Sequence, residues 1–113
     1  MSVSYLCPYV NFHGRANEAL EFYRSVFGGT IHHGPSNQMR LDAEHVSIIA
    51  TDGHPKYGPT AGDNMAIAAG GSDHEEMTRI FNGLAEGGRV KGPMNPIGYL
   101  EDRYGINWIV AAG

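Results

Sequence analysis

In each half of this chain, apolar residues recur among polar ones at the spacing of one face of a helix. In the first half, a set of apolar residues recurs at the three- and four-residue spacing of a helix face: Ala16, Ala19, Leu20, Tyr23, Val26 and Phe27. The second half repeats that spacing with Met77, Ile80, Phe81 and Leu84. A stripe of this kind predicts an amphipathic helix that buries one face. The two stripes therefore predict one helix in each half of the chain.

Short segments rich in β-branched and aromatic residues surround both helices and predict strands. In the first half these segments are residues 3–12, 30–33, 39–42 and 45–51. In the second half they are residues 64–69, 89–91, 97–101 and 106–111. The order is one strand, one helix and three strands, and it occurs twice. We therefore predict an α+β fold made of two βαβββ modules.

Both predicted helices end in a pair of glycines, which suggests that one structural unit occurs twice. Gly28 and Gly87 lie 59 positions apart, and the same number separates Phe22 from Phe81. Residues 53–62 contain three glycines and two prolines, a composition typical of a connector. We predict one domain, residues 1–113, whose modules are residues 1–52 and 63–113 with connector 53–62 between them.

The charge balance argues against some classes of binding partner, and the single cysteine favours one cellular compartment. The chain has 113 residues, of which 42% are hydrophobic, and a net charge of −4 from 8 basic and 12 acidic residues. It has no cluster of Lys and Arg, which argues against nucleic acid and against an anionic membrane surface. Cys7 alone cannot form an intrachain disulfide, which favours a reducing, cytoplasmic setting. The first eight residues lack the features of a signal peptide, and no apolar run is long enough to predict a transmembrane helix.

Five short motifs are spread over nearly the whole chain. They are Phe12-His13-Gly14, Glu18-Ala19-Leu20-Glu21-Phe22-Tyr23, Val26-Phe27-Gly28-Gly29, Asp52 and Asp102-Arg103-Tyr104-Gly105-Ile106-Asn107-Trp108. Together they resemble the PhnB-type branch of the vicinal oxygen chelate superfamily, also called the glyoxalase/bleomycin resistance/dioxygenase fold. The resemblance implies two βαβββ modules whose curved mixed sheets surround a central ligand cavity, and frequent homodimers. Many members carry a methyltransferase label, but nothing in this sequence predicts a methyl-donor fold.

Metal-dependent members of that superfamily place His or Glu on the first strand of each module and Glu on the last. The resemblance puts these positions at Cys7 or Pro8, Ser47 or Ile48, Asn64, and Trp108 or Ile109. None of these residues is a His or Glu, and a divalent ion needs three or more suitable donors. We therefore expect no metal, no other cofactor and no assigned catalytic residue.

A few polar residues remain as candidates for binding a small molecule. Cys7, Tyr9 and Asn11 share one face of the first predicted strand because side chains alternate along a strand. Asn64 would belong to the same pocket, His13 lies where the first strand meets the helix, and Glu101 precedes the last turn. Three of these residues also have a structural interpretation. Tyr9 can be a core aromatic residue, Asn11 an amide with its hydrogen bonds satisfied, and Cys7 an inert thiol.

Three hypotheses for the function follow. The first is a PhnB-like domain that binds an unknown small molecule without metal and forms a homodimer in the cytoplasm. The second is a metal-dependent lyase, isomerase or dioxygenase that uses ligands such as His13, His33 or Glu101. The third is a dimerisation module that has no ligand.

Overall fold

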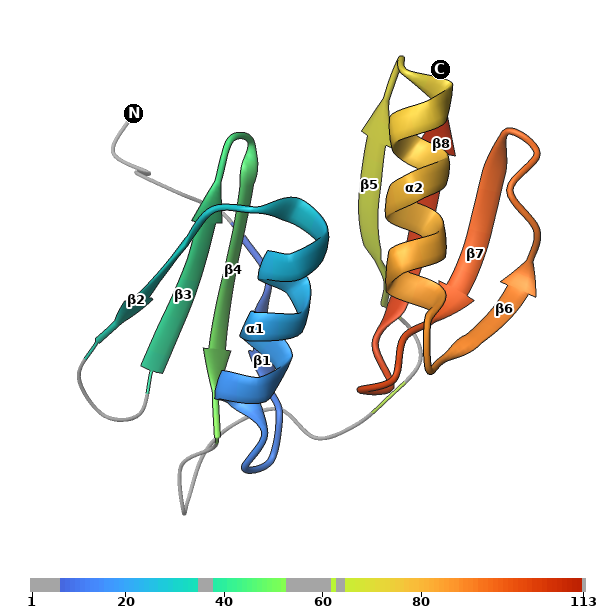
Figure 1. The fold of residues 1–113 in the computed structure, drawn as a ribbon. Coiled ribbons are helices and arrows are strands. Elements are labelled where there is room, and N and C mark those ends of the chain that lie inside the picture. The colour runs from blue at the N-terminus through green and yellow to red at the C-terminus, as the bar shows by residue number, and fades with distance from the viewer. Residues whose placement is uncertain (1–6, 35–37, 53–61, 63–64, 113) are drawn as a thin grey trace, which may run out of the picture. The chain divides into compact units, whose positions relative to one another are not determined.

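The computed structural model describes residues 7–34, 38–52, 62 and 65–112. The chain divides into two compact units, Met1–Thr60 and Ala61–Gly113. Each unit contains one helix and one four-stranded sheet (Figure 1). The predicted connector lies outside the described residues apart from Gly62, and so does the candidate Asn64.

The first unit has the predicted order of elements. They are β1 (Tyr9–Asn11), α1 (Ala16–Phe27), β2 (Thr30–His33), β3 (Gln38–Ala43) and β4 (Val46–Thr51). The strand order in the sheet is β1-β4-β3-β2, in which β1 runs parallel to β4 and the other pairs are antiparallel. Ala43 pairs with Val46, so the tight turn consists of Glu44 and His45, one position later than the gap between the predicted strands 39–42 and 45–51.

The second unit repeats this arrangement. Its elements are β5 (Ile67–Gly71), α2 (His74–Ala85), β6 (Arg89–Gly92), β7 (Ile97–Glu101) and β8 (Asn107–Ala112). The strand order β5-β8-β7-β6 matches that of the first sheet element for element, with β5 parallel to β8. The predicted α+β fold of two βαβββ modules is therefore confirmed.

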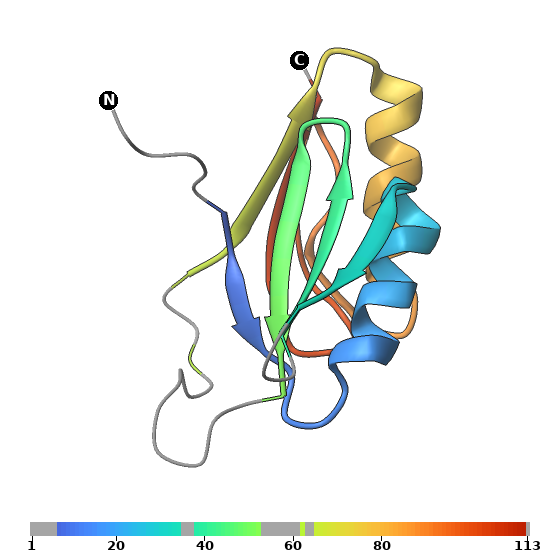
Figure 2. The same ribbon diagram turned by 90° about the vertical axis from the view of Figure 1, so that its left-hand side faces the viewer.

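In each unit the helix packs along one face of its own sheet (Figures 1 and 2). In the first unit the buried stripe of α1 meets Leu41 and Ile48 of the sheet, and in the second the stripe of α2 meets Leu100 and Val110. Each large side chain buried in this way contributes about 1.5–3 kcal/mol. Each sheet therefore has one face under its helix and an opposite face, called the open face below, that no helix of the same unit covers.

The glycine pair is equivalent in the two units, but the phenylalanine pair is not. A Cβ atom on Gly29 or on Gly88 would lie 2.3 Å from a carbonyl oxygen of β3 or β7, respectively, so only glycine lets the chain pass there. In the helices the matching positions differ by 58 residues, because an extra residue separates α2 from its glycines. Tyr23 is therefore the buried counterpart of Phe81, whereas Phe22 is only half-buried.

Both helices have 12 residues. Within the described ranges, neither helix has the length and hydropathy that crossing a membrane requires.

Candidate functional site

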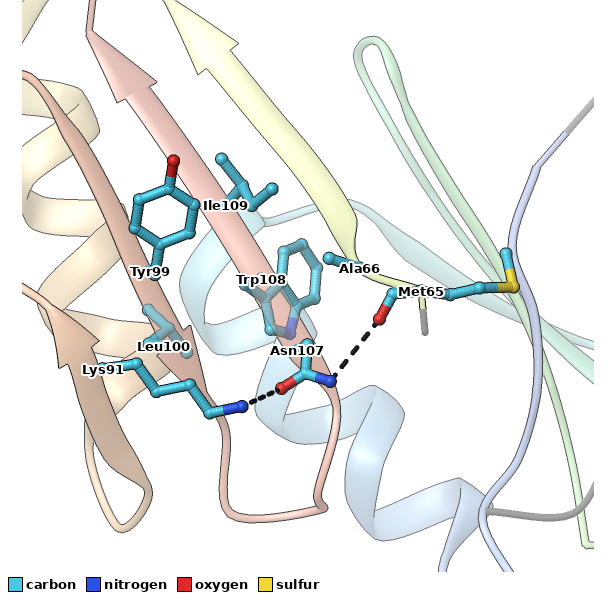
Figure 3. Close-up of a pocket in the computed structure, with 8 residues that line it drawn as sticks. All are labelled: Met65, Ala66, Lys91, Tyr99, Leu100, Asn107, Trp108 and Ile109. Carbon is cyan, nitrogen blue, oxygen red and sulfur yellow. Dashed lines mark hydrogen bonds between the residues drawn. The ribbon is translucent and has the colours of Figure 1, made fainter. Parts of the chain in front are cut away.

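A hollow of about 410 Å³ lies on the second unit (Figure 3). The residues that line it come from the segment before β5 and from strands β6, β7 and β8: Met65, Ala66, Lys91, Tyr99, Leu100, Asn107, Trp108 and Ile109. It combines an aromatic ring, aliphatic groups, one ammonium group and one amide. Such a mixture is typical of a site for a small organic molecule.

Alternation along β7 and β8 explains which side chains reach the hollow. Leu100 and Trp108 are almost fully buried on the side of α2, so their neighbours along each strand point the other way. Tyr99 and Ile109 are directly paired across the two strands and form an apolar wall on the open face. Tyr99 is 46% exposed, so a ligand could contact much of its ring.

Lys91 reaches the hollow from an irregular point in the edge strand β6. Val90 pairs with Leu100 and Gly92 pairs with Tyr99, so Lys91 is an extra residue that has no partner on β7. A shift of this kind is a β-bulge, which changes the direction of a side chain. The Nζ atom of Lys91 donates a hydrogen bond of 2.8 Å to Oδ1 of Asn107 on β8, two strands away (Figure 3).

Asn107 links this lysine to the segment before β5. Its Nδ2 atom donates to the backbone oxygen of Met65 at 3.5 Å, a long hydrogen bond (Figure 3). The amide therefore bridges β6 and the entry to β5 across the sheet. Lys91 and Asn107 form the polar side of the hollow, and Tyr99 and Ile109 form its apolar side.

The two cations of β6 differ in their partners. The guanidinium of Arg89 forms an ion pair of 3.0 Å with the Glu101 carboxylate, which is at the end of β7. Lys91 forms no ion pair with any carboxylate of the described residues. Its neighbour is the neutral amide of Asn107, so the positive charge of Lys91 is not neutralised within the hollow.

The Asp102–Trp108 motif holds this part of the sheet in shape. Asp102 is 3% exposed. Its Oδ1 atom accepts hydrogen bonds from the backbone N–H groups of Tyr104 and Ile106, at 2.8 and 3.1 Å, and its Oδ2 atom accepts one from Nε1 of Trp108 at 2.8 Å. Asp102 therefore fixes both the turn before β8 and the indole beside Asn107. This carboxylate has a structural role.

On the open face of the first unit a carboxylate is surrounded by donors. Asp42 accepts hydrogen bonds from Nε of Arg40 at 2.9 Å and from Oγ of Ser47 at 2.8 Å. Nε2 of His32 lies 3.6 Å from the same carboxylate. The charges of Asp42 and Arg40 largely neutralise each other there, whereas the charge of Lys91 in the second unit has no such partner among the described residues.

Tyr9, Asn11 and His13 lie at the edge strand β1 and the turn that follows it. Tyr9 and Asn11 share a face of β1, as predicted, and Tyr9 is half exposed. Oδ1 of Asn11 accepts a hydrogen bond of 2.9 Å from the backbone N–H of His13, which is exposed and has a φ of 52°. Asn11 thus supports a turn, and that contact is its structural role.

The remaining candidates have different surroundings. Cys7 is half-buried and precedes β1, and Asn64 falls outside the described residues. Glu101 lies next to the hollow, because it is paired with Asn107 across β7 and β8, although Arg89 already neutralises its charge. It is the candidate that the structure places beside Lys91 and Asn107.

The sequence reasoning missed Lys91, Tyr99 and Asn107. Alternation from Leu100 and Trp108, both apolar, was the signal that would have directed attention to Tyr99 and Asn107. Nothing in the sequence marks the bulge that gives Lys91 its position.

The donor set of the described residues does not suit a metal ion. Among residues 7–34, 38–52, 62 and 65–112, no three His, Cys, Asp or Glu side chains gather closely enough to hold one. Of the positions that the resemblance assigned to metal ligands, Ile48 and Trp108 are buried on the helix side of their sheets. Ser47 donates its hydroxyl proton to Asp42, and Ile109 offers no donor atom.

Comparisons with known proteins place the chain among structures of one kind. The family described as 3-demethylubiquinone-9 3-methyltransferase matches residues 32–111. Protein PA1353 from Pseudomonas aeruginosa is 28% identical, with a TM-score of 0.86, over 97% of this chain and 98% of that one. A PhnB protein from Bacillus cereus is 22% identical, with a TM-score of 0.75, over 96% and 98%.

A more distant structure has the name that describes the shared fold. The glyoxalase/bleomycin resistance protein/dioxygenase from Alicyclobacillus acidocaldarius is 11% identical, with a TM-score of 0.56, over 96% of this chain and 92% of its own. No curated protein is similar enough to count as a match. The duplicated βαβββ arrangement is thus the glyoxalase/bleomycin resistance/dioxygenase fold.

Proposed function

This chain belongs to the 3-demethylubiquinone-9 3-methyltransferase family, within the PhnB-like part of the vicinal oxygen chelate superfamily, and we propose that it is a small-molecule-binding domain. The observation that supports this function is the hollow of about 410 Å³ on the second unit. One side of the hollow is apolar and the other carries an ammonium and an amide. The ligand rests on Tyr99 and Ile109 and forms polar contacts with Lys91 and Asn107.

The exposure of large apolar side chains favours a binding face over a plain solvent-facing surface. Tyr99 and Ile97 are 46% and 45% exposed and lie on the same face of β7, since they are two residues apart in the strand. Apolar area that remains in water after folding contributes free energy when a ligand or partner covers it. A ligand with an apolar part gains that contribution at this face.

We propose that binding does not depend on a metal ion. The described residues that line the hollow include no His, Cys, Asp or Glu, and a divalent ion prefers at least three such donors. The metal-dependent alternative assigned ligands to His13, His33 and Glu101. Of these, His13 lies exposed in a turn and Glu101 pairs with Arg89, so this alternative is less well supported.

Methyl transfer, which the family description names, is not part of the proposal. Each four-stranded sheet has one parallel pair, at an edge, and its other pairs are antiparallel. The open parallel sheets that bind nucleotide-like cofactors place a glycine-rich turn between a strand and a helix. Here Gly70 and Gly71 end β5 ahead of α2 without that spacing. A shared family description also does not transfer an activity by itself.

We propose that the protein forms a homodimer and is located in the cytoplasm. Each sheet has edge strands, such as β1 and β6, whose outer backbone groups can pair with a second copy. The single Cys7 suits a reducing compartment. Multi-angle light scattering at micromolar concentration tests the dimer, and a monomer mass would contradict it. A dimer that persists while no compound binds would favour the dimerisation module.

A screen of labelled protein against small metabolites tests the binding function. Amide signals of β7 and β8 should shift in two-dimensional NMR spectra when a compound enters the hollow. Tyr99→Ala removes the apolar wall and should abolish these shifts, whereas Tyr9→Ala removes an equally exposed ring from the first unit and should leave them unchanged. The proposal is wrong if no compound moves the signals, or if only Tyr9→Ala prevents binding, which would favour the pocket expected from the sequence.

A further inference from the structure

We propose that the ligand of the hollow is a small organic anion with a single carboxylate-like group and an apolar, preferably flat, part. This inference rests on the proposed function and specifies its ligand class. Lys91 supplies the opposite charge, and Tyr99 with Ile109 supplies the apolar contact.

The charge argument rests on the contrast between Lys91 and Arg89. Both are exposed cations on β6, two residues apart, but Glu101 already neutralises the charge of Arg89 at 3.0 Å. No described carboxylate forms an ion pair with Lys91. An anion in the hollow therefore gains the attraction of Lys91 without displacing an internal partner. At Arg89 it would have to compete with Glu101.

The geometry keeps this ammonium group available. An ammonium has three donors, and Asn107 accepts one of them at 2.8 Å, which leaves two for a ligand. The same hydrogen bond holds the flexible lysine chain in place, so less side-chain entropy is lost on binding. The amide nitrogen of Asn107 has two protons, and the bond to Met65 uses one of them. The other can donate to a second oxygen of the anion.

Size and total charge limit the ligand. A volume of about 410 Å³ is at the lower end of ligand pockets, which run from about 300 to 1,000 Å³. Among the described residues a single cation lines the hollow, while the whole chain has a net charge of −4. A multiply phosphorylated molecule would meet one lysine and long-range repulsion from the rest of the chain. A small monoanion suits both the volume of the hollow and its single lysine. Tyr99 and Ile109 contact the apolar part of this ligand.

NMR titration of the full chain with three simple compounds tests the ligand class. Benzoate has the charge and the flat apolar part, benzamide is its neutral counterpart of nearly the same shape, and acetate has the charge alone. Benzoate should shift the amide signals of β7 and β8 and bind up to roughly fivefold more tightly than benzamide, since an exposed ion pair contributes up to about 1 kcal/mol. Acetate should bind more weakly than either compound, and added salt should lower the affinity for benzoate.

Two matched variants assign the charge to one residue. Lys91→Gln should remove the preference for benzoate over benzamide, whereas Arg79→Gln, which makes the same change of charge on α2 away from the hollow, should keep affinity within about twofold. Chemical shifts elsewhere in each variant confirm that the fold is intact. The inference is overturned if benzamide binds as well as benzoate, if the two variants behave alike, or if benzoate does not bind. The first two results leave the binding function standing, because a small molecule then still occupies the hollow. The metabolite screen described above decides the binding function separately.

Discussion

Replacement of Asp102 by alanine should destabilise the second unit more than most single changes. Asp102 and Trp108 are 3% and 2% exposed, and the carboxylate accepts three hydrogen bonds. An indole N–H that loses its buried acceptor costs about 1–3 kcal/mol. The two turn amides can be reached by water and cost about 0.5–1 kcal/mol each. Part of this is recovered because a buried charge no longer has to be desolvated. We expect a loss of about 2–4 kcal/mol.

Urea denaturation measures this loss directly. Trp108 is the chain's single tryptophan, so its fluorescence reports on the unit that contains the change. Asp102→Asn is the matched variant of nearly equal shape. It retains one acceptor oxygen but turns an N–H group toward one of the former donors, so it should also destabilise, by about 1–3 kcal/mol.

A double-mutant cycle separates the indole hydrogen bond from the turn. Trp108→Phe removes the N–H donor while keeping an aromatic ring in the core. In that background, followed by circular dichroism, Asp102→Asn should cost about 1 kcal/mol less than in the native chain. Equal costs in the two backgrounds, or an Asp102→Ala variant within about 0.5 kcal/mol of the native chain, would refute this account of the motif.

Three further changes follow from the structure. Gly88→Ala puts a methyl group 2.3 Å from the carbonyl oxygen of the last residue of β7 and should cost about 1–3 kcal/mol in urea. In Gly70→Ala the nearest atom is 3.7 Å away, so the cost should stay within about 0.5 kcal/mol; equal costs would contradict the steric argument. His45→Gly should stabilise the first unit by up to about 1 kcal/mol, because His45 has a φ of 61°, and a thermal melt that shows a loss would oppose this. The hydrogen bond from Arg79 lowers the pKa of Glu76, so this carboxylate stabilises α2 at neutral pH and that contribution fades as pH falls through its folded pKa. Arg79→Gln should return the pKa of Glu76 toward its ordinary value in a carbon-detected NMR titration, and an unchanged pKa would exclude this pair as the cause.

The helices and the order of the elements along the chain were predictable because strong physical signals specify them. Every buried residue of α1 and α2 belonged to a stripe at helical spacing. The glycine pairs marked places where the backbone of β3 or β7 leaves no room for a Cβ atom. The 59-residue offset between Phe22 and Phe81 suggested a wrong equivalence, because one extra residue after α2 shifts the helix relative to the glycines. Phe22 and Phe81 have the same identity, but the second matches Tyr23 in position.

The candidate site was harder to predict, for two physical reasons. Most of the candidates lay on the first predicted strand of each module, whereas the hollow is lined mainly from β6, β7 and β8. Tyr99 and Asn107 resembled ordinary strand residues until Leu100 and Trp108 were seen to be on the helix side. The position of Lys91 depends on a shift in strand pairing, and such a shift has no consistent signature in a single sequence.

The irregularity at Lys91 makes the chemistry of this fold easy to change. An edge strand has only one neighbour, so gaining or losing one residue there disturbs a single ladder and leaves the helix and the central strands in place. Loss of Lys91, the extra residue, would restore regular pairing with β7 and remove the ammonium group from the hollow. Two chains with the same architecture could then accept an acid in one case and a neutral molecule in the other. The length of β6 is therefore a means by which evolution, or an engineer, can alter what this fold selects without rebuilding its core.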